Sequence, residues 1–89
     1  MDILWDEVKS RKLKETRGVS FEDVAQLILD KRYRAVLENP SHPEQMVFVV
    51  ALKHYTYVVP FVLDENENIV LKTIFPSRKF HKLYGEKKP

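Results

Sequence analysis

The spacing of apolar residues changes from a helical to a strand period about a third of the way along this chain. Residues 7–16 predict a first helix, capped by Asp6 and stopped by Gly18, with few apolar positions and a wide basic face. Ser20 opens a second helix, which residues 30–32 end. Its apolar positions fall three and four residues apart, as in a helix that buries one face: Phe21, Val24, Ala25, Leu27 and Ile28.

Apolar runs rich in β-branched residues then predict strands, separated by polar turn residues. We expect four strands, over residues 33–38, 46–53, 55–63 and 69–75, and a short last helix over residues 80–84. Pro60 lies inside the third strand, so either that strand bulges there or that side of it is unpaired.

The order of these elements predicts an α+β fold, with two N-terminal helices on one face of a four-stranded, mainly antiparallel sheet. We expect one domain over residues 1–89, of which residues 86–89 form a frayed tail. The chain contains no cysteine, which excludes disulfides and thiolate metal sites and fits a reducing compartment. No run approaches the roughly 18 apolar residues of a membrane span, so we expect a soluble cytoplasmic protein.

The net charge of +2 is unevenly distributed. Lys and Arg outnumber acids five to four in residues 1–17 and six to one in residues 71–89, but residues 18–70 have four bases against eight acids. The balances of +1, +5 and −4 sum to +2. A basic end on a modestly charged body indicates a local polyanion site, although a solvated tail would give the same composition.

The thirteen residues from Lys72 to Tyr84 combine phosphate-binding and proton-transfer groups and contain no acid. Cleavage of RNA without metal needs a base for the 2′-hydroxyl, positive donors for the phosphate and an acid for the leaving oxygen. As catalytic candidates this segment offers Arg78, Lys79, His81 and Tyr84. The candidates for binding RNA are Lys72, Lys53, Tyr57 and Lys82.

Strand alternation places Lys72, Ile74 and Arg78 on one face if pairing stays regular past Pro76, and Lys53 and Tyr57 are expected to reach that surface. Ordinary alternatives exist for these residues: Lys72 as a solvated strand residue, His81 as a surface histidine, Tyr55 and Tyr57 as cross-strand packing. His42 and His54 fall in a loop and a turn and receive little weight.

The three histidines lack metal-ligand spacing and the chain has no glycine-rich phosphate loop, so we expect neither a metal nor a cofactor. Two readings without catalysis remain open. One is a module that only binds nucleic acid, and the other is a protein-interaction domain that pairs through an open sheet edge.

Several short motifs, in order, resemble the BrnT family of bacterial toxins. That family begins with Trp-Asp and a lysine-rich helix, continues with Lys-His-Gly-Val-Ser-Phe-Glu-Glu, and ends with Ser-Ala-Arg-Lys before a basic helix that often contains a tyrosine. This chain has Trp5-Asp6-Glu7 followed by Lys9, then Arg17-Gly18-Val19-Ser20-Phe21-Glu22-Asp23, and finally Ser77-Arg78-Lys79. The resemblance spans nearly the whole chain, and Gly-Val-Ser-Phe-Glu is its most specific part.

The resemblance implies a RelE-like fold and a ribonuclease that stops translation. It also implies a cognate antitoxin with a ribbon-helix-helix DNA-binding domain, through which the pair binds its operator DNA. Arg78 and Lys79 take the family's Arg-Lys place, and Tyr84 falls near its C-terminal tyrosine. Two departures stand out: Arg17 replaces the family's histidine before glycine, and Pro76-Ser77 precedes Arg78 with no intervening alanine.

Overall fold

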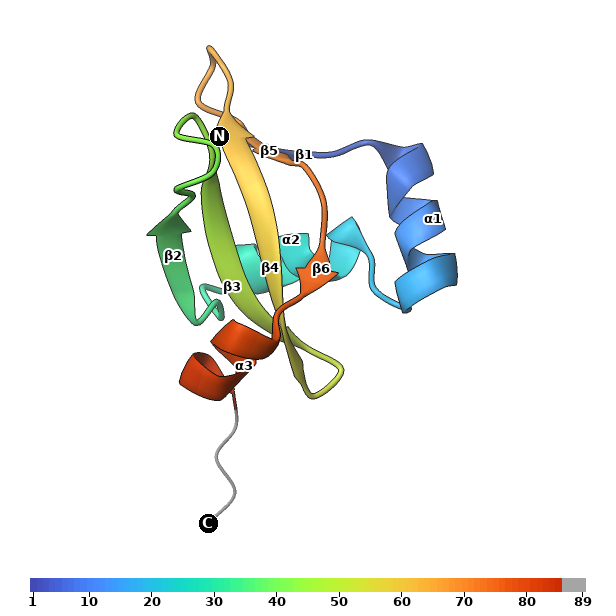
Figure 1. Ribbon diagram of the computed structural model, residues 1–89. Helices are drawn as coiled ribbons and strands as arrows, with labels where there is room; N and C mark the ends of the chain where they lie inside the picture. Colours follow the sequence, from blue (N-terminus) through green and yellow to red (C-terminus); the bar gives the residue numbers. More distant parts are fainter. Residues whose placement is uncertain (86–89) are drawn as a thin grey trace.

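The computed structural model describes residues 1–85 as three helices and six strand segments (Figure 1). The expected tail of residues 86–89 lies outside the described residues. The helices are α1 (Glu7–Arg17), α2 (Phe21–Leu29) and α3 (Arg78–Tyr84). The strands are β1 (Ile3–Leu4), β2 (Ala35–Glu38), β3 (Met46–Leu52), β4 (Tyr55–Leu63), β5 (Ile69–Leu71) and β6 (Phe75–Pro76).

The first two helices begin at the capping residues that the sequence predicts, and the first helix also ends at the predicted glycine. The Asp6 carboxylate accepts hydrogen bonds from the amides of Val8 and Lys9, which have no partner inside the helix. Gly18 closes α1 in the left-handed conformation (φ 73°), as is common for a glycine at this position. The Ser20 hydroxyl accepts from the amide of Asp23 and caps α2 in the same way.

The prediction of an α+β fold is confirmed, but the prediction of four strands is wrong. The strands form one mixed sheet in the order β1-β5-β4-β3-β2, with β6 pairing with β4 beyond the end of β5. β1 runs parallel to β5, with Ile3 opposite Ile69. Two residues are too few to show a strand period, so no local pattern indicates β1.

The predicted strand over residues 69–75 is interrupted opposite Pro60. Leu71 pairs with Phe61 and Phe75 pairs with Val58, so residues 72–74 oppose only residues 59 and 60 of β4. The Pro60 carbonyl accepts from the Lys72 amide (2.9 Å). Because the nitrogen and oxygen of a strand residue point to the same side, the missing N–H of Pro60 faces this break. The predicted irregularity at Pro60 is present, but the extra residue of the bulge lies in the partner segment rather than in β4.

Different helices pack against the two faces of the sheet (Figure 1). α2 lies against one face, where the main core includes Phe21, Phe48, Val59 and Phe61. α3 lies against the other face, beside β4. The prediction that both N-terminal helices pack on one face is wrong: α1 lies beyond the edge formed by β1, β5 and β6 and inserts Leu13 into the core. None of the helices described is long and apolar enough to cross a lipid bilayer.

Candidate nucleic-acid interface

α3 begins as a continuation of β6 and is held against β4 at its first turn. The Ser77 amide donates to the Thr56 carbonyl (3.0 Å), and the Ser77 hydroxyl accepts from the Phe80 amide (3.2 Å). The helix therefore starts at a fixed point on the sheet. Its three cationic residues, Arg78, Lys79 and Lys82, are all exposed to solvent and have no acidic neighbour within the helix.

His81 is the candidate residue whose side chain is held most firmly. Its ring stacks on Tyr55, with ring centroids 4.1 Å apart and an interplanar angle of 21°. Its Nδ1 lies 3.0 Å from the hydroxyl of Thr56, which is buried in β4. Within residues 1–85, Nε2 makes no hydrogen bond. The imidazole is thus fixed through one nitrogen, whichever tautomer it adopts, and the residue as a whole is partly exposed.

Gly85 closes the helix directly against His81. Its amide donates to the His81 carbonyl (2.8 Å), and a Cβ at this position would lie 2.7 Å from His81 Nδ1. Only glycine allows so close an approach, because real Cβ contacts do not reach this distance. The end of α3 therefore helps to hold the imidazole.

Lys79 and Tyr84 gather around Phe80 on the same helix. The Lys79 ammonium lies 5.7 Å from the centroid of the Phe80 ring, and the Tyr84 ring lies 6.0 Å from it. Tyr84 is half-buried. These contacts restrict both side chains and place a phenol and an ammonium within one turn of His81.

The predicted common face of Lys72, Ile74 and Arg78 is wrong for Ile74. Ile74 is fully buried in the main core, while Lys72 is exposed on the α3 side of the sheet. The break opposite Pro60 separates β5 from β6 and ends the regular alternation on which that prediction depended. Lys72 precedes β6 and Arg78 follows it, in a helix that lies on the same side of the sheet as Lys72.

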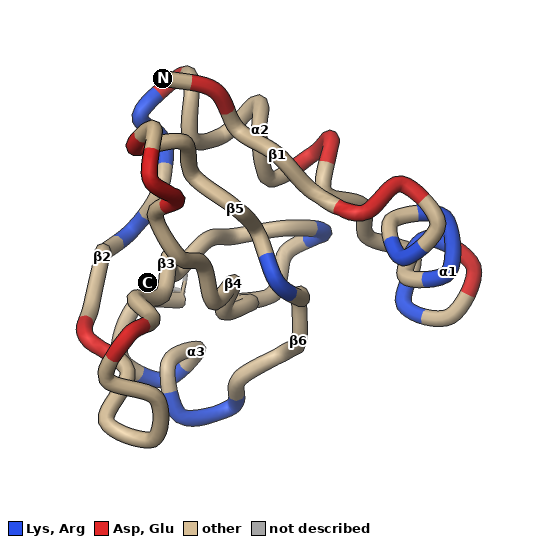
Figure 2. Tube along the Cα trace, turned by 90° about the horizontal axis from the view of Figure 1, so that it is seen from above, with Lys and Arg blue, Asp and Glu red and all other residues tan. Residues whose placement is uncertain are grey.

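Lys53 and Tyr57 do not join this surface, contrary to the prediction. Tyr57 is directly opposite Val50 and packs against the core on the α2 side. Lys53 lies in the tight β3–β4 turn, where it and His54 both have positive φ (50° and 64°). Its ammonium lies over Gly18, in a cleft beside α2. In Figure 2 the Lys and Arg positions of α3 lie apart from those of α1.

A cleft of about 430 Å³ lies on the α3 side of the sheet, over Pro60. Lys9 reaches it from α1, Lys72 and Phe75 border it on one side, and the β2–β3 loop borders it on the other. The loop contributes the side chains of Asn39, Ser41, His42 and Gln45. Sequence reasoning gave His42 little weight and missed Asn39 and Gln45, because only the folded loop brings them opposite Lys72.

Thr56 and Tyr55 were also missed as partners of His81. Their alternating apolar context in β4 predicts packing and gives no signal for a contact with a helix that starts more than twenty residues later. Such a contact depends on the β6 pairing that turns the chain back across β4.

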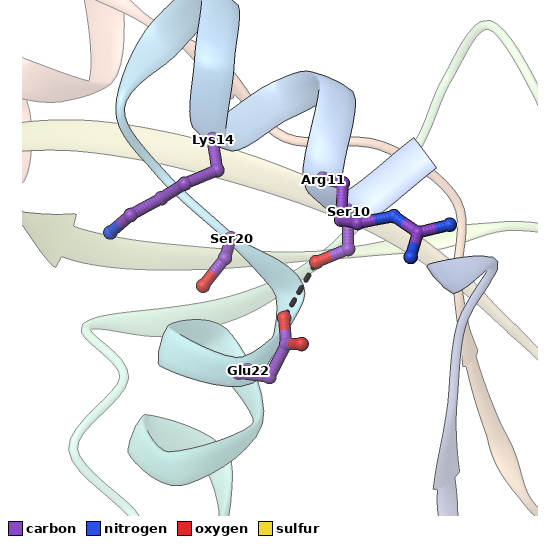
Figure 3. A pocket seen from close by; sticks show the side chains of 5 residues that line it. All are labelled: Ser10, Arg11, Lys14, Ser20 and Glu22. Carbon is purple, nitrogen blue, oxygen red and sulfur yellow. Dashed lines mark hydrogen bonds between the residues drawn. The ribbon is translucent and has the colours of Figure 1, made fainter. Parts of the chain in front are cut away.

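A smaller cleft between α1 and α2 has a structural explanation (Figure 3). The buried Ser10 hydroxyl accepts from the Phe21 amide (3.0 Å) and donates to Glu22 (2.6 Å). The hydrogen bond from Ser10 holds the pKa of Glu22 below its ordinary value. These bonds join the two helices and account for the positions of the Ser10 and Glu22 side chains in this cleft.

Among residues 1–85 no group of three or more His, Asp or Glu side chains is arranged to hold a metal ion. Comparison with protein-family models, with curated proteins and with solved structures found no match.

Proposed function

We propose that this protein is the toxin of a type II toxin–antitoxin pair, an endoribonuclease that cleaves unpaired RNA without a metal ion and inhibits translation. The observation that supports it most is the imidazole of His81, which belongs to the acid-free cationic helix α3 and is fixed by Thr56 and Tyr55 of β4. A positioned proton-transfer group next to phosphate-binding cations is what metal-independent cleavage requires.

In this proposal the 2′-oxygen of the RNA attacks the adjacent phosphorus, and the bond from phosphorus to the 5′-oxygen breaks. His81 transfers one proton, and Lys79 or Tyr84 of the same helix is the candidate for the second transfer. The planar fork of Arg78 stabilises the negative charge that grows on the phosphate oxygens. Lys82 and Lys72 bind neighbouring phosphates as point charges.

The resemblance to the BrnT family supports the same proposal, with a RelE-like fold, action in the cytoplasm and a ribbon-helix-helix antitoxin through which operator DNA is bound. The antitoxin would neutralise the toxin by covering the cations of α3. Arg17, at the place of the family's histidine, has a different use here: its guanidinium donates to the Ile74 carbonyl in the break between β5 and β6. That position therefore supports the fold.

A second candidate function is a module that binds nucleic acid without cleaving it. The feature that favours it is α1, whose exposed cations offer phosphate contacts on an element separate from α3: Lys9, Arg11, Lys12 and Lys14. Binding that depends on α1, with no cleavage, would favour this function.

The direct test incubates purified protein with unpaired RNA in excess chelator. We expect cleavage by the unmodified protein and a loss of roughly 100- to 1000-fold in rate for Arg78→Ala, the typical effect of removing one transition-state donor. Lys53→Ala, a lysine removed from the opposite face, is the matched control and should cleave normally. In cells, growth arrest on expression should disappear with Arg78→Ala and persist with Lys53→Ala. A fully toxic Arg78→Ala variant would contradict the role of Arg78.

A further inference from the structure

The α3 side of the sheet carries a continuous series of side chains from His81 to the cleft over Pro60. Residues of one strand face alternate, so Thr56, Val58 and Pro60 of β4 point to the same side. Thr56 contacts His81, Val58 pairs with Phe75, and Pro60 lines the cleft. From Thr56 to Pro60 the strand advances about 13 Å, which a few nucleotides of unpaired RNA can span.

Phe75 lies between the two ends of this series. The residue is 39% exposed and lines the cleft, while its backbone pairs with β4 opposite Val58. An aromatic ring that is half open to solvent and fixed by strand pairing is a platform on which an unpaired base can stack.

The cleft itself combines the groups that recognise a nucleotide. Lys9 and Lys72 approach it from separate elements, so a phosphate there can be bound from two sides. In the opposite wall the Asn39 side-chain amide donates to the Gln45 side-chain oxygen (3.3 Å), which leaves the Gln45 amide nitrogen and the second N–H of Asn39 as donors for a base edge. The Asn39 side chain also accepts from the Ser41 amide, which fixes its position in the loop.

We infer that this cleft is a second RNA subsite, which binds a nucleotide a few positions away from the bond that is cleaved. This inference rests on the proposed function, because it takes unpaired RNA as the ligand. Phe75 stacks with a base, Lys72 and Lys9 hold the adjacent phosphate, and Asn39 and Gln45 contact the base edge. Binding energy from this subsite positions the scissile phosphate at α3.

The test measures binding of a labelled unpaired RNA of mixed sequence in which every 2′-hydroxyl is methylated, so that cleavage cannot interfere. At 0.1 M salt, loss of one phosphate contact in Lys72→Ala should weaken binding about fivefold and reduce the salt slope by about 0.7. Lys72→Arg should restore most of the affinity. Lys53→Ala, on the other face, should bind as the unmodified protein does.

Phe75→Ala should weaken binding by at least about fivefold, the lower end of the range for one base stacked on an aromatic side chain. Because this change also removes apolar contacts, Phe75→Leu provides a second measurement. It keeps the apolar volume and the fold and removes the aromatic face, so it should show a similar loss of affinity with an unchanged thermal transition.

Two results decide the inference. If Lys72→Ala and Phe75→Leu both bind the methylated RNA as tightly as Lys53→Ala does, the subsite is overturned, whatever the cleavage assay shows. If they lose affinity as stated while the unmodified protein fails to cleave ordinary RNA, the subsite stands and the ribonuclease proposal fails. If the unmodified protein does not bind RNA at all, both are contradicted.

Discussion

At the scale of single residues, the position of His81 depends on partners from another element. Thr56 contributes a buried hydroxyl at 3.0 Å from Nδ1, and Tyr55 contributes a stacked ring. Two independent contacts restrict both the rotation of the ring and the direction of its second nitrogen. A side chain held in this way loses little conformational entropy when it binds a substrate.

Replacing Thr56 by valine tests this arrangement. Valine keeps the branched shape and removes the hydroxyl, so the sheet should stay intact while the imidazole loses its hydrogen bond. Since one such bond contributes about 1 kcal/mol, we expect RNA cleavage to fall roughly five- to tenfold. Thr56→Ser should keep most of the activity, as measured by initial rates at saturating RNA. Equal rates for all three proteins would show that this bond does not position the catalytic group.

At the scale of elements, the junction between α1 and α2 depends on the buried side chain of Ser10. Its hydroxyl is the partner of the Phe21 amide, one of the amides that α2 itself cannot satisfy, and also donates to Glu22. Replacing Ser10 by alanine leaves that buried amide without a partner. We expect the free energy of unfolding at pH 7 to fall by about 1–3 kcal/mol, measured by urea denaturation.

The Glu22 contact makes part of this stability depend on pH. Its pKa is lowered in the folded protein by the hydrogen bond from Ser10, so the contribution is present above the ordinary value of 4.5 and is lost as the pH falls through the folded value. The unmodified protein should therefore be more stable than Glu22→Gln near pH 7, and the difference should shrink below pH 4.5. A difference that grows on acidification would contradict the assignment.

Gly18 forms the turn between these helices. For the stability of a variant, its left-handed backbone conformation should matter more than the close contacts that a Cβ would make there. A Cβ there would lie 2.7 Å from the Lys53 ammonium, which is the flexible end of a side chain and can move away. The strain that a positive φ of 73° imposes on a residue with a Cβ cannot be relieved by such a movement. Gly18→Ala should lower the free energy of unfolding by about 1–2 kcal/mol, and adding Lys53→Ala should not restore it. Full recovery in the double variant would assign the loss to crowding.

Sequence patterns predicted the local structure of this protein better than its long-range pairing. Asp6, Gly18 and Ser20 mark the helix ends because caps act within a few residues, and the two long apolar runs gave β3 and β4 with nearly the observed bounds. The effect of Pro60 was foreseen on β4 but not on its partner, because the register of β6 depends on pairing across more than fifteen residues.

At the scale of the whole molecule, the chain's basic residues divide between separate surfaces. The candidate residues of the last segment remain together on the α3 side, whereas Lys53 and Tyr57 belong to the α2 side. The candidate residues that are close together in the sequence thus stay together on α3. The residues that were assigned to one strand face by alternation do not, because the break opposite Pro60 ends that alternation. The cleft that adds Lys9, His42 and Phe75 to this side joins three distant parts of the chain, which no local pattern indicates.

The central claim is that α3 promotes attack by the RNA's own 2′-hydroxyl, and the chemistry of the product ends tests it most directly. Unpaired RNA is digested by the purified protein in excess chelator, beside the same RNA with 2′-deoxyribose throughout. We predict fragments ending in a 2′,3′-cyclic phosphate and a 5′-hydroxyl, no cleavage of the deoxy substrate, and loss of cleavage with His81→Ala. Fragments with 5′-phosphate ends, cleavage of the deoxy substrate, or an intact RNA would contradict the account.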